Sequence, residues 1–186
     1  MRITSGRYEV TLIDEPIYSL RSVDNPRSYL REYCRDKKYH HACAHGINVV
    51  EDKALLSSAV LIGIGGATGV HENSIVLDGS SLYVATGDAL YSLSLPTLEL
   101  NWCQQVDLAA CFEVFLLPNR DCLLTCGELE ISCYSKVGEK LWGFCGGDIF
   151  TGEIEIKNNI AKVSDFIGDI YEIELSNGKI VNIENK

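Results

Sequence analysis

The stretches Ser81-Leu-Tyr-Val-Ala-Thr-Gly87 and Asp121-Cys-Leu-Leu-Thr-Cys-Gly127 decide the fold, because they repeat one pattern at an offset of 40 residues. The same offset superposes Trp102 on Trp142. A third copy, 159–175, follows with a slip of one residue. Periods near 40 residues with several short strands per unit are typical of β-propeller blades and related arrays.

Each complete unit is predicted to contain four short strands joined by turns, because apolar runs alternate with turn residues. The second unit has a turn at Gly87-Asp88, and Pro96 ends a strand because proline cannot donate to a ladder. A sheet of this kind cannot bury both faces alone, so neighbouring units must stack. The expected strands are Ser74–Leu77, Leu82–Thr86, Leu90–Leu95 and Leu98–Trp102, then Glu113–Leu117, Cys122–Cys126, Leu129–Tyr134 and Lys140–Phe144.

The first unit is weaker, and the segment before it differs in kind. Arg7–Leu12 alternates like a strand, whereas Asn25-Pro26 is typical of the start of a short helix, here expected to run to about Lys38. We therefore predict an N-terminal arm, 1–45, that packs on an all-β, propeller-like array of about four blades, 46–186. The array is either a small closed propeller or a truncated open one. The helix would use Tyr29, Leu30, Tyr33 and Cys34 as its apolar side, and the first unit would contain strands at Gly46–Val50, Ala54–Ser57 and Ala59–Ile64.

The segment from Leu82 to Leu95, with the closing Trp102, resembles the repeat of quinoprotein-type β-propellers. Four further segments resemble a group of small bacterial proteins with such blades. The resemblance implies a propeller fold and a bacterial origin, and it supplies no activity. Quinone-dependent dehydrogenases have about twice as many blades, so we expect no cofactor. The four segments are Gly65–Ser74, Ala110–Phe115, Gly127–Ser132 and Gly147–Phe150.

The charge is strongly acidic and unevenly spread. The net charge is −10, with +2 in residues 1–41 and −12 in residues 42–186. Between Ala54 and Ser135 the only basic side chain is Arg120. Such a surface repels phosphate and attracts a basic protein, so we expect no nucleic-acid partner and a basic protein partner.

The chain is expected to be cytoplasmic and not to contact a membrane. Met1–Val10 has no apolar core of a secretory signal. The longest apolar stretch, Ser58–Gly66, is far shorter than the roughly 20 residues of a spanning helix. None of the eight cysteines forms a Cys-x-x-Cys pair, and reduced, buried thiols are the favoured interpretation. An exported disulfide framework is the alternative.

Gly63-Ile-Gly-Gly-Ala-Thr-Gly69 follows an apolar strand, as a dinucleotide-binding glycine loop does. Phosphate binding there needs a helix that opens directly after the loop. Instead Val70-His-Glu-Asn-Ser leads straight into the strand Ile75–Leu77, which leaves no room for a crossover helix. A loop at the edge of a blade with a positive φ angle is the favoured interpretation.

Polar residues directly after this loop are the candidate site for a ligand or partner, because propellers present their binding surfaces at strand ends. The alternative is that Thr68 and Asn73 satisfy backbone groups in turns and that the charges are only solvated. The candidate residues are Thr68, His71, Glu72 and Asn73, joined by Glu128 and Asp148.

Two other chemistries are disfavoured. Cys43-Ala-His45 could be one pair of zinc ligands, with His40, His41 and Cys34 nearby, but no clean second pair exists, so we predict no metal site. Glu128 with Glu130 or Asp148 could act as the acid and base of a glycosidase. Acidic residues are so abundant that this pairing is weak evidence.

The sequence favours a non-catalytic protein-binding module of the bacterial cytosol. An immunity-type inhibitor of a basic toxin is the specific version, since complementary charge would speed encounter and a few aromatic anchors would supply affinity. The alternative is a small-ligand sensor or hydrolase with a site around Thr68, His71, Glu72 and Asn73.

Overall fold

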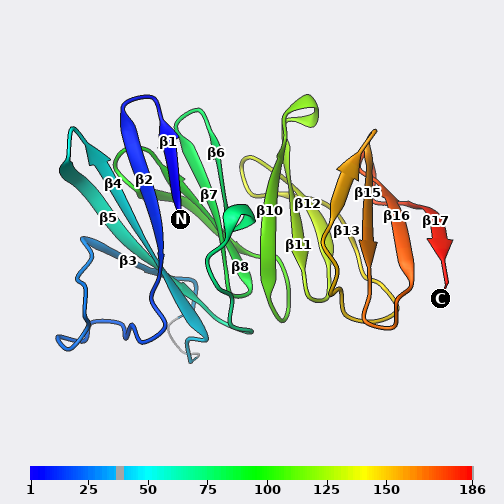
Figure 1. Cartoon of the computed structure of the whole chain (residues 1–186), viewed down its shortest axis with the longest axis horizontal. Helices are drawn as coiled ribbons and strands as arrows, with labels where there is room; N and C mark the ends of the chain where they lie inside the picture. Colours follow the sequence, from blue (N-terminus) through cyan, green and yellow to red (C-terminus); the bar gives the residue numbers. More distant parts are fainter. Residues whose placement is uncertain (37–39, 186) are drawn as a thin grey trace.

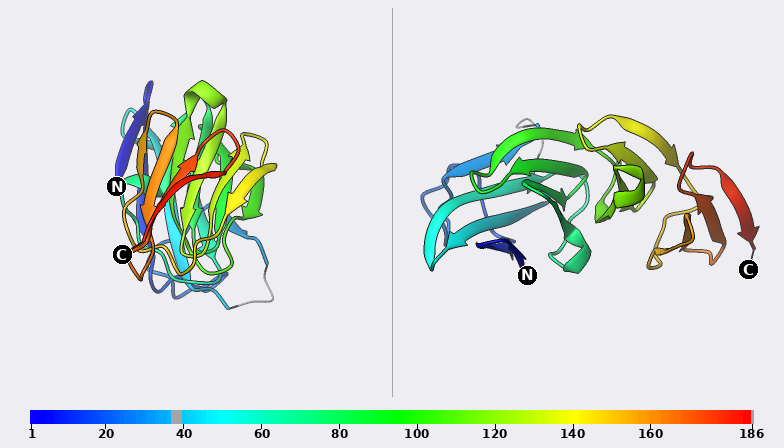
Figure 2. Two further views of the ribbon diagram at one scale, coloured as in Figure 1. Left: turned by 90° about the vertical axis from the view of Figure 1, so that its right-hand side faces the viewer. Right: turned by 90° about the horizontal axis from the view of Figure 1, so that it is seen from above.

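The computed structural model describes residues 1–36 and 40–185, which form an all-β array of four sheets. The sheets stand side by side in chain order along the long axis (Figure 1). Seen from above, they follow an open arc (Figure 2). No strand of the last sheet pairs with the first among the described residues. The predicted propeller-like array of about four blades is confirmed, in its open form.

The first sheet has five strands in the order β1-β2-β4-β5-β3. All neighbours are antiparallel except β3, which runs parallel to β5 at the outer edge. The N-terminal segment therefore supplies the two inner strands of the first blade, and the predicted boundary between residues 45 and 46 lies inside β4. The strands are β1 (Arg2–Ser5), β2 (Tyr8–Asp14), β3 (Arg31–Cys34), β4 (Cys43–Glu51) and β5 (Ala54–Gly63).

The predicted helix after Asn25-Pro26 is wrong for the described residues, which form bends and then β3. Tyr33 packs on the core between the first two sheets, whereas Cys34 packs on the opposite face of the first sheet. Successive side chains on opposite faces are the property of a strand and not of one helical side. Leu30 is exposed, and the predicted end at Lys38 lies outside the described residues.

The other three sheets are four-stranded meanders in sequence order. Most predicted strands are confirmed with ends shifted by a few residues, and the two predicted strands 54–57 and 59–64 form the single strand β5. The elements are η1 (Glu72–Ser74), β6 (Ile75–Asp78), β7 (Ser81–Thr86), β8 (Ala89–Ser94), β9 (Glu99–Gln105), β10 (Cys111–Leu117), η2 (Pro118–Arg120), β11 (Cys122–Gly127), β12 (Ile131–Ser135), β13 (Lys140–Phe144), β14 (Glu155–Lys157), β15 (Ile160–Ser164), β16 (Ile170–Glu174) and β17 (Ile180–Glu184).

Each pair of neighbouring sheets shares its own hydrophobic core. Ile47 and Leu61 of the first sheet meet Tyr91 of the second, and Tyr83 of the second meets Leu123 of the third. A further cluster joins the third and fourth sheets. Contacts are therefore made between nearest neighbours, as in repeat proteins, and the array can be stable without closing into a ring.

The tryptophans of the repeat link one blade to the next. The indole N–H of Trp102 in β9 donates to the carbonyl of Lys136 at 2.9 Å, and that of Trp142 in β13 donates to the carbonyl of Leu175 at 3.2 Å. Each ring lies against a glycine turn of the next blade, at Gly138 (φ +88°) and Gly178 (φ +72°). The repeat of 40 residues therefore contains the residues of an interface between blades as well as a pattern of strands.

The two end faces of the array are covered differently. On the first sheet, Tyr18 and Tyr29 from the segment between β2 and β3 pack over Val60 and Ile62. On the last sheet, Lys162 lies 3.7 Å from a carboxylate oxygen of Glu172. The last strand, β17, also exposes Ile180, Val181 and Ile183, so among the described residues only the first end of the array is covered.

The eight cysteines are free thiols, and Cys111, Cys122, Cys126 and Cys133 are buried. Burial raises the pKa of the Cys103 thiol to about 12, so this side chain stays protonated at neutral pH. Among the described residues, no helix is long and apolar enough to cross a membrane.

Candidate functional site

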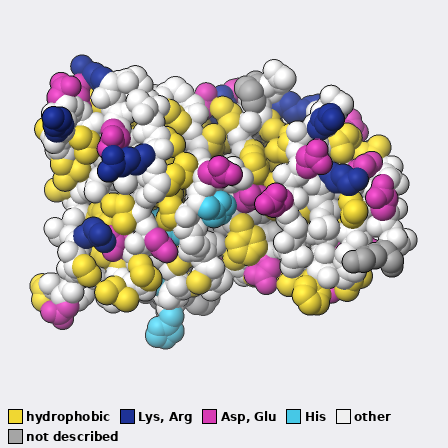
Figure 3. All heavy atoms as spheres, viewed as in Figure 1, with side chains coloured by type: hydrophobic (Ala, Val, Ile, Leu, Met, Phe, Trp, Pro, Cys, Tyr) yellow, Lys and Arg dark blue, Asp and Glu magenta, His cyan; other side chains and the backbone are white. Residues whose placement is uncertain are grey.

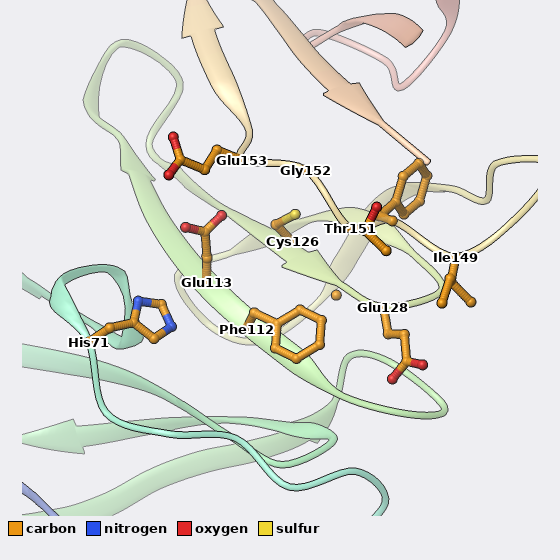
Figure 4. A pocket seen from close by; sticks show the side chains of 11 residues that line it. His71, Phe112, Glu113, Cys126, Glu128, Ile149, Thr151, Gly152 and Glu153 are labelled. Atoms are coloured by element: carbon orange, nitrogen blue, oxygen red, sulfur yellow. The ribbon is translucent and has the colours of Figure 1, made fainter. Parts of the chain in front are cut away.

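The candidate site is a pocket on the concave side of the arc. The first strand of each blade lies on this side and the last strand lies on the convex side (Figure 2). The pocket has a volume of about 490 Å³ and lies where β10, the turn after β11 and the segment before β14 meet (Figure 4). Its lining residues are His71, Phe112, Glu113, Cys126, Gly127, Glu128, Ile149, Phe150, Thr151, Gly152 and Glu153.

The floor of the pocket is apolar. Cys126 and Phe150 are each only 3% exposed, and Phe150 packs edge-on against Tyr171 with ring centroids 6.0 Å apart. Phe112 lies at a β-bulge, because the pairing of β10 with β11 shifts between Cys111 and Glu113. A bulge re-aims a side chain, and here it accompanies a partly exposed aromatic ring in the wall of the pocket.

The rim of the pocket is acidic. Glu113, Glu128 and Glu153 come from three different segments of the chain, and none of them lies within ion-pair distance of a lysine or arginine among residues 1–36 and 40–185. In Figure 3, which shows the concave side, acidic side chains surround a hydrophobic patch near the centre. The arrangement suits an apolar group that carries a positive charge.

Hydrogen bonds to the connecting segments before β10 and before β14 fix the turn that carries Glu128. The Glu128 N–H donates to the carbonyl of Ala110 at 2.7 Å, and its carbonyl accepts from the Phe150 N–H at 2.8 Å. The Asp107 carboxylate accepts from the N–H groups of Leu129 and Glu130, at 2.9 Å each. The Glu128 side chain therefore projects from a turn that these hydrogen bonds hold in place.

Two of the predicted residues lie at the pocket or contact its wall from the loop before β6. His71 lines the pocket, and its Nδ1 accepts from the Asn73 N–H at 3.4 Å at the start of η1. The Asn73 side-chain amide donates to the Glu113 carboxylate at 2.9 Å. Glu72 is exposed on η1 and does not line the pocket. With Glu128, which lines the pocket from the turn after β11, three of the six predicted residues lie at the pocket or contact its wall.

Thr68 has a structural environment away from the pocket. It is 7% exposed, and its hydroxyl accepts from the Gly87 N–H at 2.9 Å. Its carbonyl accepts from Nε2 of the buried His45 at 3.0 Å, so Nδ1 of that ring is free to accept from the Thr86 hydroxyl at 3.2 Å. Asp148 is exposed and accepts from the Ile149 N–H at 2.7 Å, next to the pocket but outside its lining.

The glycine loop serves close packing between blades. A Cβ built on Gly63 would meet the Gly87 Cα at 2.8 Å, and Gly65 has a φ of +75°. The chain from Gly69 to β6, all of it described, contains only the three-residue turn η1. The phosphate-binding geometry of a long helix after this loop is therefore missing here.

Among the residues considered as zinc ligands, Cys43 and His45 both contact Thr68, and His40 and His41 are exposed. His45 is buried, and burial lowers its pKa below the usual 6.5. The Cys43 thiol lies 3.4 Å from the Thr68 hydroxyl. Among the residues that the structure describes, no group of three or more His, Cys, Asp or Glu side chains could hold a metal ion.

Sequence reasoning missed Phe112, Glu113, Ile149 and Glu153. Phe112, Glu113 and Ile149 lie in segments that carry the resemblance to small bacterial proteins, 110–115 and 147–150, and this was the one available signal. Glu153 lies in a loop without a motif. Nothing in one sequence ranks it above the other acidic residues.

No protein-family model matches the chain, and no curated protein matches it. Solved structures of propellers do match. The RRP9 WD40 repeats match with a TM-score of 0.51 and 13% identity over 63% of this chain and 40% of that one. BamB from Moraxella catarrhalis has a TM-score of 0.57 and 8% identity over 80% of this chain and 50% of its own. The computationally designed Ika8 protein has a TM-score of 0.57 and 10% identity over 98% and 60%.

These similarities show a propeller-type fold. The chain spans only 40–60% of the length of these natural and designed propellers. At this level of identity the matches carry the architecture and no activity.

Proposed function

We propose that this chain is a non-catalytic module that binds a basic protein through its concave side. The observation that carries the proposal is the pocket with an apolar floor and three carboxylates that have no cationic partner among the described residues. Uncompensated carboxylates around an apolar surface bind a positively charged group better than a neutral or negative one.

The charge of the whole chain supports the same partner. The net charge of −10 and the sparse basic side chains between Ala54 and Ser135 produce a negative field around the second and third blades. Such a field raises the rate of encounter with a basic protein and makes that rate sensitive to salt. Affinity would then depend on a few well-packed anchors such as Phe112.

An immunity-type inhibitor of a basic toxin in the bacterial cytosol is the specific form of this proposal. An inhibitor of this kind needs only to cover a basic surface of the toxin, and it needs no catalytic group. The open arc supports this role, because its concave side is accessible to a protein segment (Figure 2).

The experiment is affinity capture from the native cell with three baits: the wild type, a pocket variant and a control variant. The pocket variant is Glu113→Gln, Glu128→Gln and Glu153→Gln. The control, Asp24→Asn, Asp52→Asn and Glu139→Gln, changes the net charge equally at exposed sites outside the pocket.

We expect one basic protein to bind the wild type and the control in low salt, and to be lost from the pocket variant and in high salt. Purified partner should then bind with the same pattern. Equal capture by the pocket variant and the control, or capture that does not respond to salt, would contradict the proposal.

A small-ligand sensor or hydrolase is the second candidate, because a pocket of about 490 Å³ is within the size range of small-molecule sites. His71 would then contact the ligand. A thermal-shift screen should find a stabilising ligand, and His71→Ala should remove that stabilisation without lowering the melting temperature of the free protein.

A further inference from the structure

We propose that the concave pocket takes the side chain of a single arginine of the partner protein. This inference rests on the proposed function and names the group that the site recognises. It requires an apolar surface for the stem, a flat surface for the guanidinium and carboxylates placed around it.

The apolar residues of the wall and the floor supply the first two requirements. Phe112 and Ile149 are partly exposed in the wall, and Cys126 and Phe150 close the base. The methylene stem of a long basic side chain packs on such a surface while its charged end stays near water. The ring of Phe112 can also stack against the planar guanidinium, which favours arginine over lysine.

The carboxylates supply the third requirement. Figure 4 shows the Glu113 and Glu153 carboxylates on one side of Phe112 and the Glu128 carboxylate on the other. A guanidinium has five N–H donors spread in a plane, so it can reach acceptors on two sides at once, whereas the ammonium group of lysine is a compact charge.

None of the described lysines and arginines forms an ion pair with a pocket carboxylate, so these residues supply no internal occupant of the pocket. Lys140 pairs with Glu130 at 2.5 Å, and Arg35 pairs with Asp88 at 2.6 Å. Lys136 pairs with both Asp78 and Asp121. A cation that pairs with the three pocket carboxylates would therefore come from outside these residues.

The test uses short acetylated and amidated peptides on the isotope-labelled full chain, with NMR shifts of backbone amides as the readout. The probes are Ser-Gly-Arg-Gly-Ser, the same peptide with lysine, and the same peptide with neutral citrulline. We expect the arginine peptide to shift the amides of Glu113, Glu128 and Glu153 in a saturable way below about 10 mM. The lysine peptide should bind several-fold more weakly and the citrulline peptide not measurably.

Variants separate the parts of the site. Phe112→Ala should weaken the arginine peptide several-fold and remove its advantage over lysine. The pocket variant should lose binding at least about tenfold, whereas the control variant should bind like the wild type. If the triple change prevents folding, Glu153→Gln alone, on an exposed loop position, should still weaken binding.

Equal binding of the lysine and arginine peptides would overturn the arginine assignment and leave the proposed basic partner standing. Shifts outside the pocket, or no shift up to about 10 mM, would overturn it as well. If the affinity capture finds no basic protein that binds the wild type in low salt and is lost in high salt, the proposed function itself is refuted.

Discussion

Replacing Trp102 by alanine should destabilise the array at the interface between its second and third blades. Trp102 is partly buried, it lies against the Gly138 turn, and its ring is 5.9 Å from that of Tyr83. Removing a fully buried tryptophan costs about 3–5 kcal/mol, and partial burial reduces this to about 2 kcal/mol. The Lys136 carbonyl also loses its donor, which adds about 1 kcal/mol.

The expected total is about 3 kcal/mol, which for a chain of this length lowers the melting temperature by about 6–12 °C. Trp102→Phe keeps an aromatic ring and removes the donor, so it should cost about 1 kcal/mol. Leu100→Ala on the same strand is the control, because Leu100 is 40% exposed and should change stability by less than about 1 kcal/mol.

Urea unfolding, followed by far-UV circular dichroism and by fluorescence, measures these changes. Since the chain has two tryptophans, the Trp102 variants leave Trp142 as the sole reporter of the interface between the third and fourth blades. Weaker coupling between blades should separate the unfolding transition followed by circular dichroism from the one followed by fluorescence. A free energy of unfolding for Trp102→Ala within about 0.5 kcal/mol of the wild type would refute the role given to the indole.

Three further predictions concern stability. Burial holds the pKa of His45 below its value in the unfolded chain, so the folded protein favours the neutral ring. The free energy of unfolding should therefore fall by up to about 1.4 kcal/mol per pH unit as the pH drops below 6.5. His45→Gln should flatten this dependence in urea titrations from pH 7.5 to about 5.5, and the exposed His71→Gln should not. Gly178→Ala should lower the melting temperature, because its Cβ would lie 2.5 Å from the Trp142 ring at a positive φ; an unchanged melting temperature would contradict that contact. Asp107→Ala leaves the N–H groups of Ala109, Leu129 and Glu130 without their acceptor and should cost about 1–3 kcal/mol and speed hydrogen exchange of Leu129, with slow exchange in the variant as the contrary result.

The repeated blades could be predicted from the sequence because their strands and turns follow one another without interruption. The tryptophans and the glycine turns recur at the same interval, since each pair makes the same contact between neighbours. The first blade was predicted only in part, because the segment 15–42 separates β2 from β4 and its strands are not consecutive in sequence. Strand pairing at that distance leaves no periodic signal.

The short segment before β3 was misjudged for a related reason. Asn25-Pro26 is a good start for a helix, but the Asn25 side chain instead binds the backbone of Ser19 and Ser22 and closes a loop. Tyr18 and Tyr29 then bury the outer face of the first sheet. Burial of that face, which is a tertiary effect, outweighs the local preference for a helix.

The pocket illustrates which parts of a binding site one sequence can reveal. Its polar wall near His71 follows a conspicuous glycine loop, so it could be found. The decisive aromatic, Phe112, depends on a one-residue bulge in β10, and a bulge changes which side of a strand a residue faces without changing the residue pattern. The three carboxylates become distinctive only when the structure shows that no described lysine or arginine lies within ion-pair distance of them, because position relative to other charges, and not residue type, would separate the proposed recognition site from an ordinary acidic surface.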